Sequence, residues 1–195
     1  MFDFQTAVLY DLDSRSLGGG GRLVVADSQL EPHRAGVPAL LVSLAHYLED
    51  LRDLLARAEH VHEVDRLLDA ETIAVIGCSS TPGKAAHDVP AYLQRQGYRV
   101  IPVNPFADEI LGEAAYDALG DVEEPVDLVN VFRPSEEIPG ILEAVRERHA
   151  ERGDAGAAWL QLGISDDEAA AAAETDGIEV VQDRCLKVEH GRLRG

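Results

Sequence analysis

From residue 61 onward, segments of nearly continuous apolar residues alternate with segments in which every third or fourth residue is apolar. Short, almost continuous apolar runs are typical of strands buried on both faces of a sheet, and apolar residues at every third or fourth position are typical of helices. The predicted strands lie in TIAVIG (72–77), YRVIPVNP (98–105), PVDLVNVFRP (125–134), AGAAWLQLG (155–163) and IEVVQDRCLKVEH (178–190). The predicted helices lie in VHEVDRLLDAE (61–71), KAAHDVPAYLQRQG (84–97), SEEIPGILEAVRERHAERG (135–153) and SDDEAAAAAETDG (165–177). This alternation predicts an α/β fold with a doubly wound, mostly parallel, Rossmann-like sheet.

Individual residues indicate where these helices begin. Pro90 fits the first turns of the second helix, where a missing N–H costs least. Ser135 is predicted to cap the third helix. Ser165 and Glu168 have the spacing of a capping box for the fourth.

The first 60 residues fit this order less well. Residues 38–58 have leucines at helical spacing, so we expect an N-terminal helical extension. Three interpretations stay open: an appendage that packs on the domain or on a second subunit, a mobile extension, or upstream sequence translated from a misplaced start codon. We divide the chain into this extension over residues 1–60 and a domain over residues 61–195.

Charge and composition narrow the class of protein. The 17 basic and 36 acidic residues give a net charge of −19, which excludes general nucleic-acid binding because no basic face is available for a phosphate backbone. Lys84 and Lys187 are the only lysines. Acid excess with arginine in place of lysine favours a salt-adapted, halophilic protein; an ordinary acidic protein is the alternative. No apolar run of about 18 residues and no signal-peptide pattern is present, so we expect a cytoplasmic protein that does not span a membrane.

Cysteine and histidine spacing does not indicate a metal site or a disulfide framework. Cys78 and Cys185 lie far apart in the sequence, and both are expected to be thiols. The seven histidines form no cluster with metal-ligand spacing.

The segment GCSSTPGK (77–84) is the candidate ligand loop, because it joins the first predicted strand to a helix. Glycines at both ends permit a tight turn and a close approach of backbone N–H groups, and a helix N-terminus favours an anion. We therefore expect a phosphate or pyrophosphate here, with an ordinary strand-to-helix turn as the alternative. The loop matches neither G-x-G-x-x-G, because Ser79 replaces the second glycine, nor a P-loop. The second strand ends in Asn104, not in the carboxylate that binds ribose in NAD sites, so a nucleotide with an extra phosphate is tolerated.

The segments VIGCSSTPGKAAHDVPAYLQRQGYRVIPVNP, ILGEAAYDALGDVEEPVDLVNVFRPSEEIP, AAWLQLGI and VVQDRCLKVEH, in this order, resemble the small stand-alone CoA-binding proteins. These are related to the CoA-binding, Rossmann-like domain of the succinyl-CoA synthetase alpha subunit. The resemblance covers residues 66–190. It implies that the chain binds coenzyme A or an acyl-CoA, with the phosphates at the first loop. The residues that it implies around the phosphates are Gly77, Ser79, Ser80, Thr81, Gly83 and Lys84. Those beside the adenosine half are Asn104 and Pro105, and those of the opposite wall are Phe132, Arg133 and Pro134.

Several of these assignments have competing interpretations. For Lys84 the alternatives are contact with a phosphate and a solvated lysine at a helix start. For Arg133 they are contact with the ligand and an ion pair with Glu136 or Glu137. Gln161 and Gly163, at the end of a strand, could also line the crevice.

Only ten residues of this sequence follow residue 185, so we do not expect the phosphohistidine domain and the ATP-binding region of the larger acyl-CoA synthetases. We expect a CoA-binding protein that acts as a sensor, carrier or regulatory partner and not as an enzyme. Two alternatives stay open: an NAD(P)-binding oxidoreductase or redox sensor, and a structural module that binds a second copy or another protein through the helix at residues 38–58.

Overall fold

The computed structural model describes residues 39–195, and our expectations for residues 1–38 lie outside this range. The chain separates into two compact units, Met1–His46 and Tyr47–Gly195. The fold below is that of the second unit, together with helix α1 (Ala39–Leu67), which runs into it. No helix among the described residues is long and apolar enough to cross a membrane.

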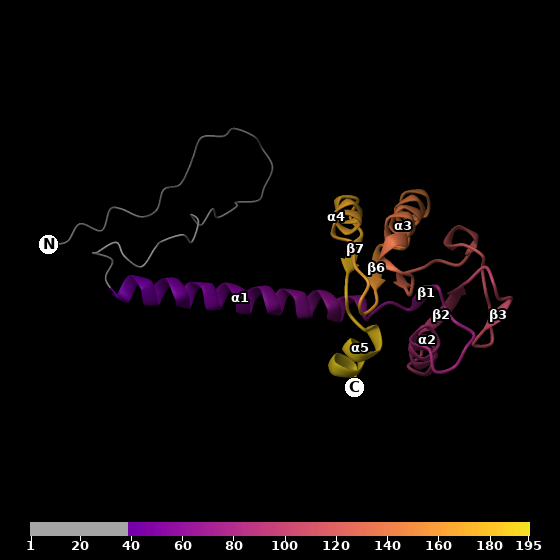
Figure 1. The fold of residues 1–195 in the computed structure, drawn as a ribbon, viewed down its shortest axis with the longest axis horizontal. Helices are drawn as coiled ribbons and strands as arrows, with labels where there is room; N and C mark the ends of the chain where they lie inside the picture. The colour runs from indigo at the N-terminus through magenta and orange to yellow at the C-terminus, as the bar shows by residue number, and fades with distance from the viewer. Residues whose placement is uncertain (1–38) are drawn as a thin grey trace. The chain divides into compact units, whose positions relative to one another are not determined.

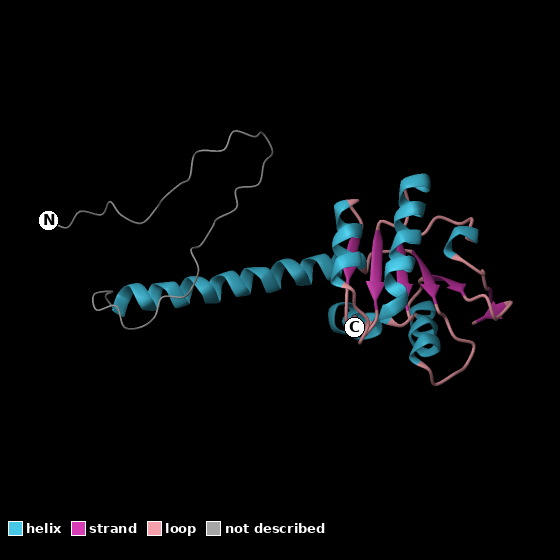
Figure 2. Cartoon of the chain, turned by 45° about the horizontal axis from the view of Figure 1, so that its top comes forward, coloured by secondary structure: helices cyan, strands magenta, loops and turns pink. Residues whose placement is uncertain are grey.

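A five-stranded parallel sheet in the order β2-β1-β5-β6-β7 forms the centre of the domain (Figures 1 and 2). Its strands are β1 (Thr72–Ile76), β2 (Arg99–Val103), β5 (Leu128–Val131), β6 (Ala157–Leu160) and β7 (Glu179–Val181). The chain passes from β1 to β2 on one side and then crosses to β5 on the other side of β1. The strand order therefore reverses beside β1, which is where open α/β sheets bind ligands.

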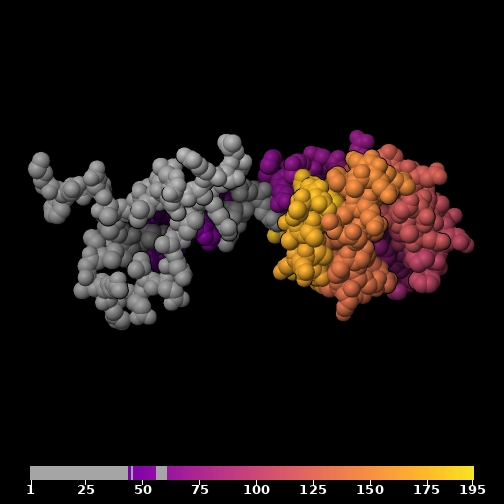
Figure 3. Space-filling model, turned by 90° about the horizontal axis from the view of Figure 1, so that it is seen from above, coloured from indigo at the N-terminus to yellow at the C-terminus, as the bar shows by residue number. Residues whose placement is uncertain are grey.

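Helices cover both faces of the sheet, as a doubly wound fold requires. One core contains Val129, Val131 and Leu160 packed under α3 (Ile138–Arg152) and α4 (Asp167–Thr175), which lie side by side in Figure 3. The other core contains Ile73 and Val75 with the end of α1, α2 (Ala85–Arg95) and α5 (Leu186–Arg194). Alternate residues of each strand enter opposite cores, so the continuous apolar runs of the sequence are explained and the predicted fold class is confirmed.

Three details of the predicted elements are wrong. The segment 178–190 is not one strand, because β7 ends at Val181 and α5 begins at Leu186. Ser135 does not cap α3; it begins a short 3-10 turn, and its hydroxyl oxygen accepts a hydrogen bond from the Ser165 N–H. Helix α4 is capped by Asp166, whose side chain accepts from the Ala169 N–H at 2.9 Å, so the cap lies one residue after the predicted Ser165.

Smaller elements complete the domain between β2 and β5. Strands β3 (Glu109–Ile110) and β4 (Glu113–Ala114) form an antiparallel hairpin, and a 3-10 turn spans Leu119–Asp121. The sequence patterns do not predict this hairpin. The predicted helix over 61–71 is the last part of α1, which is continuous from Ala39.

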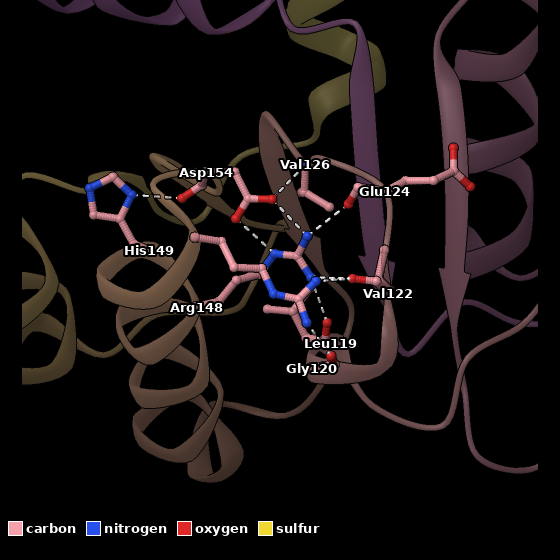
Figure 4. Close-up of polar contacts among 9 residues, drawn as sticks. Leu119, Gly120, Val122, Glu124, Val126, Arg148, His149 and Asp154 are labelled. Atoms are coloured by element: carbon pink, nitrogen blue, oxygen red, sulfur yellow. Dashed lines mark hydrogen bonds and ion pairs between the residues drawn. The ribbon is translucent and has the colours of Figure 1, made fainter.

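A buried arginine fixes the segment that leads into β5 (Figure 4). The Arg148 side chain is 2% exposed, and its guanidinium donates to the carbonyl oxygens of Leu119, Val122 and Glu124 at 2.8–2.9 Å. It also forms two hydrogen bonds to the carboxylate of Asp154, at 2.7 and 2.9 Å. Burial would raise the pKa of Asp154, but hydrogen bonds from Arg148 and from a backbone N–H outweigh it and lower the pKa. The buried charge is therefore paired and fully engaged, as a buried guanidinium must be.

Candidate functional site

A crevice of about 410 Å³ opens beyond the carboxyl ends of β1, β2 and β5. The loops that follow these three strands meet there because β1 pairs with both of the others. Its lining consists of Gly77, Cys78, Ser79, Lys84, Ala86, Val103, Asn104, Pro105, Phe106, Arg133 and Glu137. The crevice thus lies where the strand order reverses, the position that the sequence analysis assigns to the ligand.

Gly77 lets the β1 loop pass close to the β5 loop. Its φ is +78°, in the left-handed region. A Cβ at this position would lie 2.8 Å from Cδ of Arg133 and 3.1 Å from the carbonyl oxygen of Phe132. The Gly77 N–H donates to the carbonyl of Val103 at 3.0 Å, so all three loops converge on this residue. Only glycine satisfies both the backbone angle and the close contact.

Hydrogen bonds within the β1 loop hold its shape. The Thr81 N–H donates to the Ser79 hydroxyl oxygen at 3.1 Å, and the Gly83 N–H donates to the Asp88 carboxylate at 3.0 Å. This bond from Gly83, followed by the bond from the neighbouring His87, lowers the pKa of Asp88, which is therefore ionised at neutral pH. These hydrogen bonds join the loop to itself and to the start of α2.

Pro90 supplies a further tether between the β1 loop and α2. In a regular helix the N–H of residue 90 would donate to the carbonyl of Ala86, but proline has no N–H. The Ser79 N–H donates to this carbonyl instead, at 2.9 Å. Pro90 is buried inside α2, beyond its first turn, and the acceptor that it frees fixes the loop on the helix.

Asn104 joins the β1 and β2 loops. Its side-chain N–H donates to the carbonyl of Cys78 at 2.7 Å, and its side-chain oxygen accepts from the Phe106 N–H at 2.9 Å. The amide has the donor and acceptor that this bridge needs, and a carboxylate could not donate. Phe106, held by this bond, is 90% exposed at the mouth of the crevice.

Lys84 and Arg133 are the two cations of the crevice, and they differ in their partners. The Lys84 ammonium forms no ion pair with any residue of the described range. Arg133 forms two hydrogen bonds to Glu137, at 2.6 and 2.8 Å, which is the ion pair of its second interpretation. Its contact with a ligand stays a prediction. Contact with Arg133 lowers the pKa of Glu137. The uncompensated positive charge of the crevice is therefore that of Lys84.

Cys78 is the one thiol of the crevice, and its environment suppresses ionisation. Burial raises the pKa of Cys78 to about 12. The thiol is consequently protonated at neutral pH and is a poor nucleophile. Among the side chains that the structure describes (residues 44, 46–55 and 61–195), no group of three or more metal-binding residues comes together.

The predicted site residues divide into three groups. Gly77, Ser79, Lys84, Asn104, Pro105 and Arg133 line the crevice. Ser80, Thr81 and Gly83 are exposed on the same loop, and Phe132 and Pro134 flank Arg133. Gln161 and Gly163 do not line it: the Gln161 amide is buried and donates to Asn130 at 2.8 Å, and the Gly163 N–H donates to Asp183.

Phe106 and Glu137 also line the crevice and were not predicted to do so. The available signal for Phe106 was an aromatic residue directly after the Asn104-Pro105 turn at a strand end. For Glu137 it was the spacing of four residues from Arg133, which places the two charges one turn apart.

Comparison with known proteins identifies the family to which this chain is similar. The model of the CoA binding domain matches residues 71–191. The uncharacterized protein YneT of Bacillus subtilis is 40% identical over 129 residues, which are 66% of this chain and 92% of that protein. A solved structure from Thermus thermophilus, cell-free ID.343, is 44% identical with a TM-score of 0.62 and covers 69% of this chain and 97% of its own. The ADP-forming acetate–CoA ligase of Methanocaldococcus jannaschii is 30% identical over 54% of this chain, but the match spans 14% of that enzyme.

Proposed function

Because the chain belongs to the CoA binding domain family, we propose that its crevice holds coenzyme A or an acyl-CoA. The observation that carries the proposal is the ammonium of Lys84, which has no ion pair among the described residues and lies in a hydrogen-bonded loop where the strand order reverses. A polyanionic ligand needs such a local cation on a chain with a net charge of −19.

The phosphates of the ligand would lie between the β1 loop and the start of α2. Lys84 is the N-cap residue of α2, its backbone is extended, and no side chain caps this end of the helix. The first N–H groups of a helix lack partners within it, and together with the helix dipole they favour an anion. Lys84 adds a charged donor at the same place.

The adenosine half of the ligand would lie against the β2 loop, at Asn104, Pro105 and Phe106. Asn104 carries no charge, so this wall does not repel the phosphate that coenzyme A carries on its ribose. The exposed ring of Phe106 offers a flat apolar surface to a base, and its backbone is fixed by the hydrogen bond to Asn104.

The role that we propose is binding, as a sensor, carrier or regulatory partner, and not catalysis. The Cys78 thiol remains protonated, and Arg133 is neutralised by Glu137. The ligase activity of the M. jannaschii relative belongs to a much longer protein, of which the matched region is 14%.

Displacement of a fluorescent CoA analogue tests the assignment of Lys84. A charge-assisted hydrogen bond contributes about 1.5–3 kcal/mol, so Lys84→Ala should raise the Kd for CoA by roughly 10-fold to 150-fold. The matched control is Lys187→Ala, which removes the same charge from α5, where Lys187 lies 5.4 Å from the Tyr92 ring centre. Equal affinities of wild type and Lys84→Ala would remove Lys84 from the site, and an equal loss in both variants would show an effect of net charge alone.

A further inference from the structure

Helix α1 has a leucine pattern that the CoA-binding fold does not explain. Leu41, Leu44, Leu48, Leu51 and Leu55 follow one another at alternating spacings of three and four residues. This is the a and d pattern of a heptad repeat, whose period of 3.5 residues keeps one seam facing a partner helix. Apolar Tyr47 and Leu54 occupy the adjoining g positions and widen the seam.

From Leu44 to Leu55 the side chains of this seam are exposed. The exposed fractions are 50% for Leu44, 59% for Tyr47, 56% for Leu48, 36% for Leu51, 62% for Leu54 and 63% for Leu55. Further along the same helix, Val64 is fully buried against the domain. Helix α1 is therefore anchored in the core at its C-terminal end, while the leucines of its middle turns face solvent.

The fold of the relatives is complete without this part of the helix. The family match begins at residue 71, and the T. thermophilus structure aligns over 97% of its own length with only 69% of this chain. The exposed leucines are thus not needed to close the core of the domain, and their burial requires another surface.

We propose that this surface is the same seam of a second copy of the chain, so that two α1 helices pair as a coiled coil. Charge permits the pairing even though the chain carries −19. In the heptad defined by Leu48 at a, the acidic residues Glu49, Asp50 and Asp53 fall at b, c and f, away from the seam, and Arg52 falls at e. In a parallel pair e faces g, so Arg52 faces Tyr47 and like charges do not meet across the interface. A second seam also matches the first in spacing and in apolar character.

The exposed surface of the seam is also large enough for a specific interface between two chains. If a large side chain exposes roughly 200 Å² when free, the seam from Leu44 to Leu55 presents roughly 600 Å² per chain and roughly 1,200 Å² for a pair, at the lower end of the range for specific interfaces. The sequence continues the pattern at Leu41.

Sedimentation velocity of the full chain between about 1 and 100 μM tests the proposal. Wild type should sediment with twice the chain mass, and the double variant Leu48→Lys, Leu51→Lys should sediment as a monomer, with a Kd for self-association raised at least about 100-fold. The matched control Glu49→Lys, Asp53→Lys places two lysines in the same turns outside the seam and should remain dimeric. Circular dichroism checks that both variants keep their helix content. A monomeric wild type at every concentration, or a dimer that persists in the Leu48, Leu51 variant, would overturn the proposal.

Discussion

Replacement of Gly77 by alanine measures how strictly the crevice depends on contact between the β1 and β5 loops. Two costs are expected. A left-handed backbone costs about 1–2 kcal/mol for a residue with a Cβ, partly offset by about 0.4–1 kcal/mol from the less flexible unfolded chain. The new Cβ would also lie 2.8 Å from Cδ of Arg133 and 3.1 Å from the Phe132 carbonyl oxygen. The arginine chain can move, but the carbonyl is backbone, and overpacking of this kind costs about 1–3 kcal/mol.

Gly83→Ala is the internal control, because Gly83 lies in the same loop with a φ of +85° and nothing within 4 Å of an added Cβ. It should lower the free energy of unfolding by about 1 kcal/mol, and Gly77→Ala should lower it by about 2–4 kcal/mol. Urea denaturation of both variants, followed by circular dichroism, gives the two values. Equal losses would refute the reasoning, since they would show that the close contact with the β5 loop contributes nothing beyond backbone strain.

Three further predictions concern the ligand, pH and salt. Phe106→Ala should weaken CoA binding by about 1–3 kcal/mol in calorimetry through loss of base stacking, with unchanged thermal stability because the ring is exposed; an unchanged Kd would place the base elsewhere. Burial lowers the pKa of His190, so His190 of the unfolded chain binds a proton at a higher pH than in the folded chain, and the free energy of unfolding of wild type should fall as pH drops below about 6.5. Urea titrations at several pH values should show a shallower fall for His190→Gln, and identical pH profiles of the two proteins would contradict this reasoning. The melting temperature should rise steeply into molar KCl because salt screens the 36 acidic residues, and a flat or falling response would contradict the salt-adapted interpretation.

The parallel sheet was predictable because its strands are short, continuous apolar runs separated by helices of the right length. β1, β2, β5 and β6 all lie within the predicted segments. The helix ends were less predictable, because Ser135, Ser165 and Asp166 are all competent caps and tertiary contacts decide among them. The hydroxyl of Ser135 accepts from the Ser165 backbone, a contact between segments 30 residues apart that local pattern cannot indicate.

The site was predictable in its position and less so in its details. Glycines and a lysine in the first loop, with Asn104 after the second strand, mark one crevice once the strands are known to be parallel. The bridge that Asn104 forms between Cys78 and Phe106 depends on the distance between two loops, which the sequence does not contain. The same holds for Gln161, which lies at a strand end but turns inward to Asn130.

The most direct test of the central claim is calorimetric titration of the full chain with CoA, at the salt concentration that it tolerates, followed by competition with NADH. We predict one CoA per chain with micromolar or tighter affinity and no displacement by NADH. Absence of heat with CoA, together with binding of NADH, would contradict the proposed function while leaving the fold and its crevice unchanged.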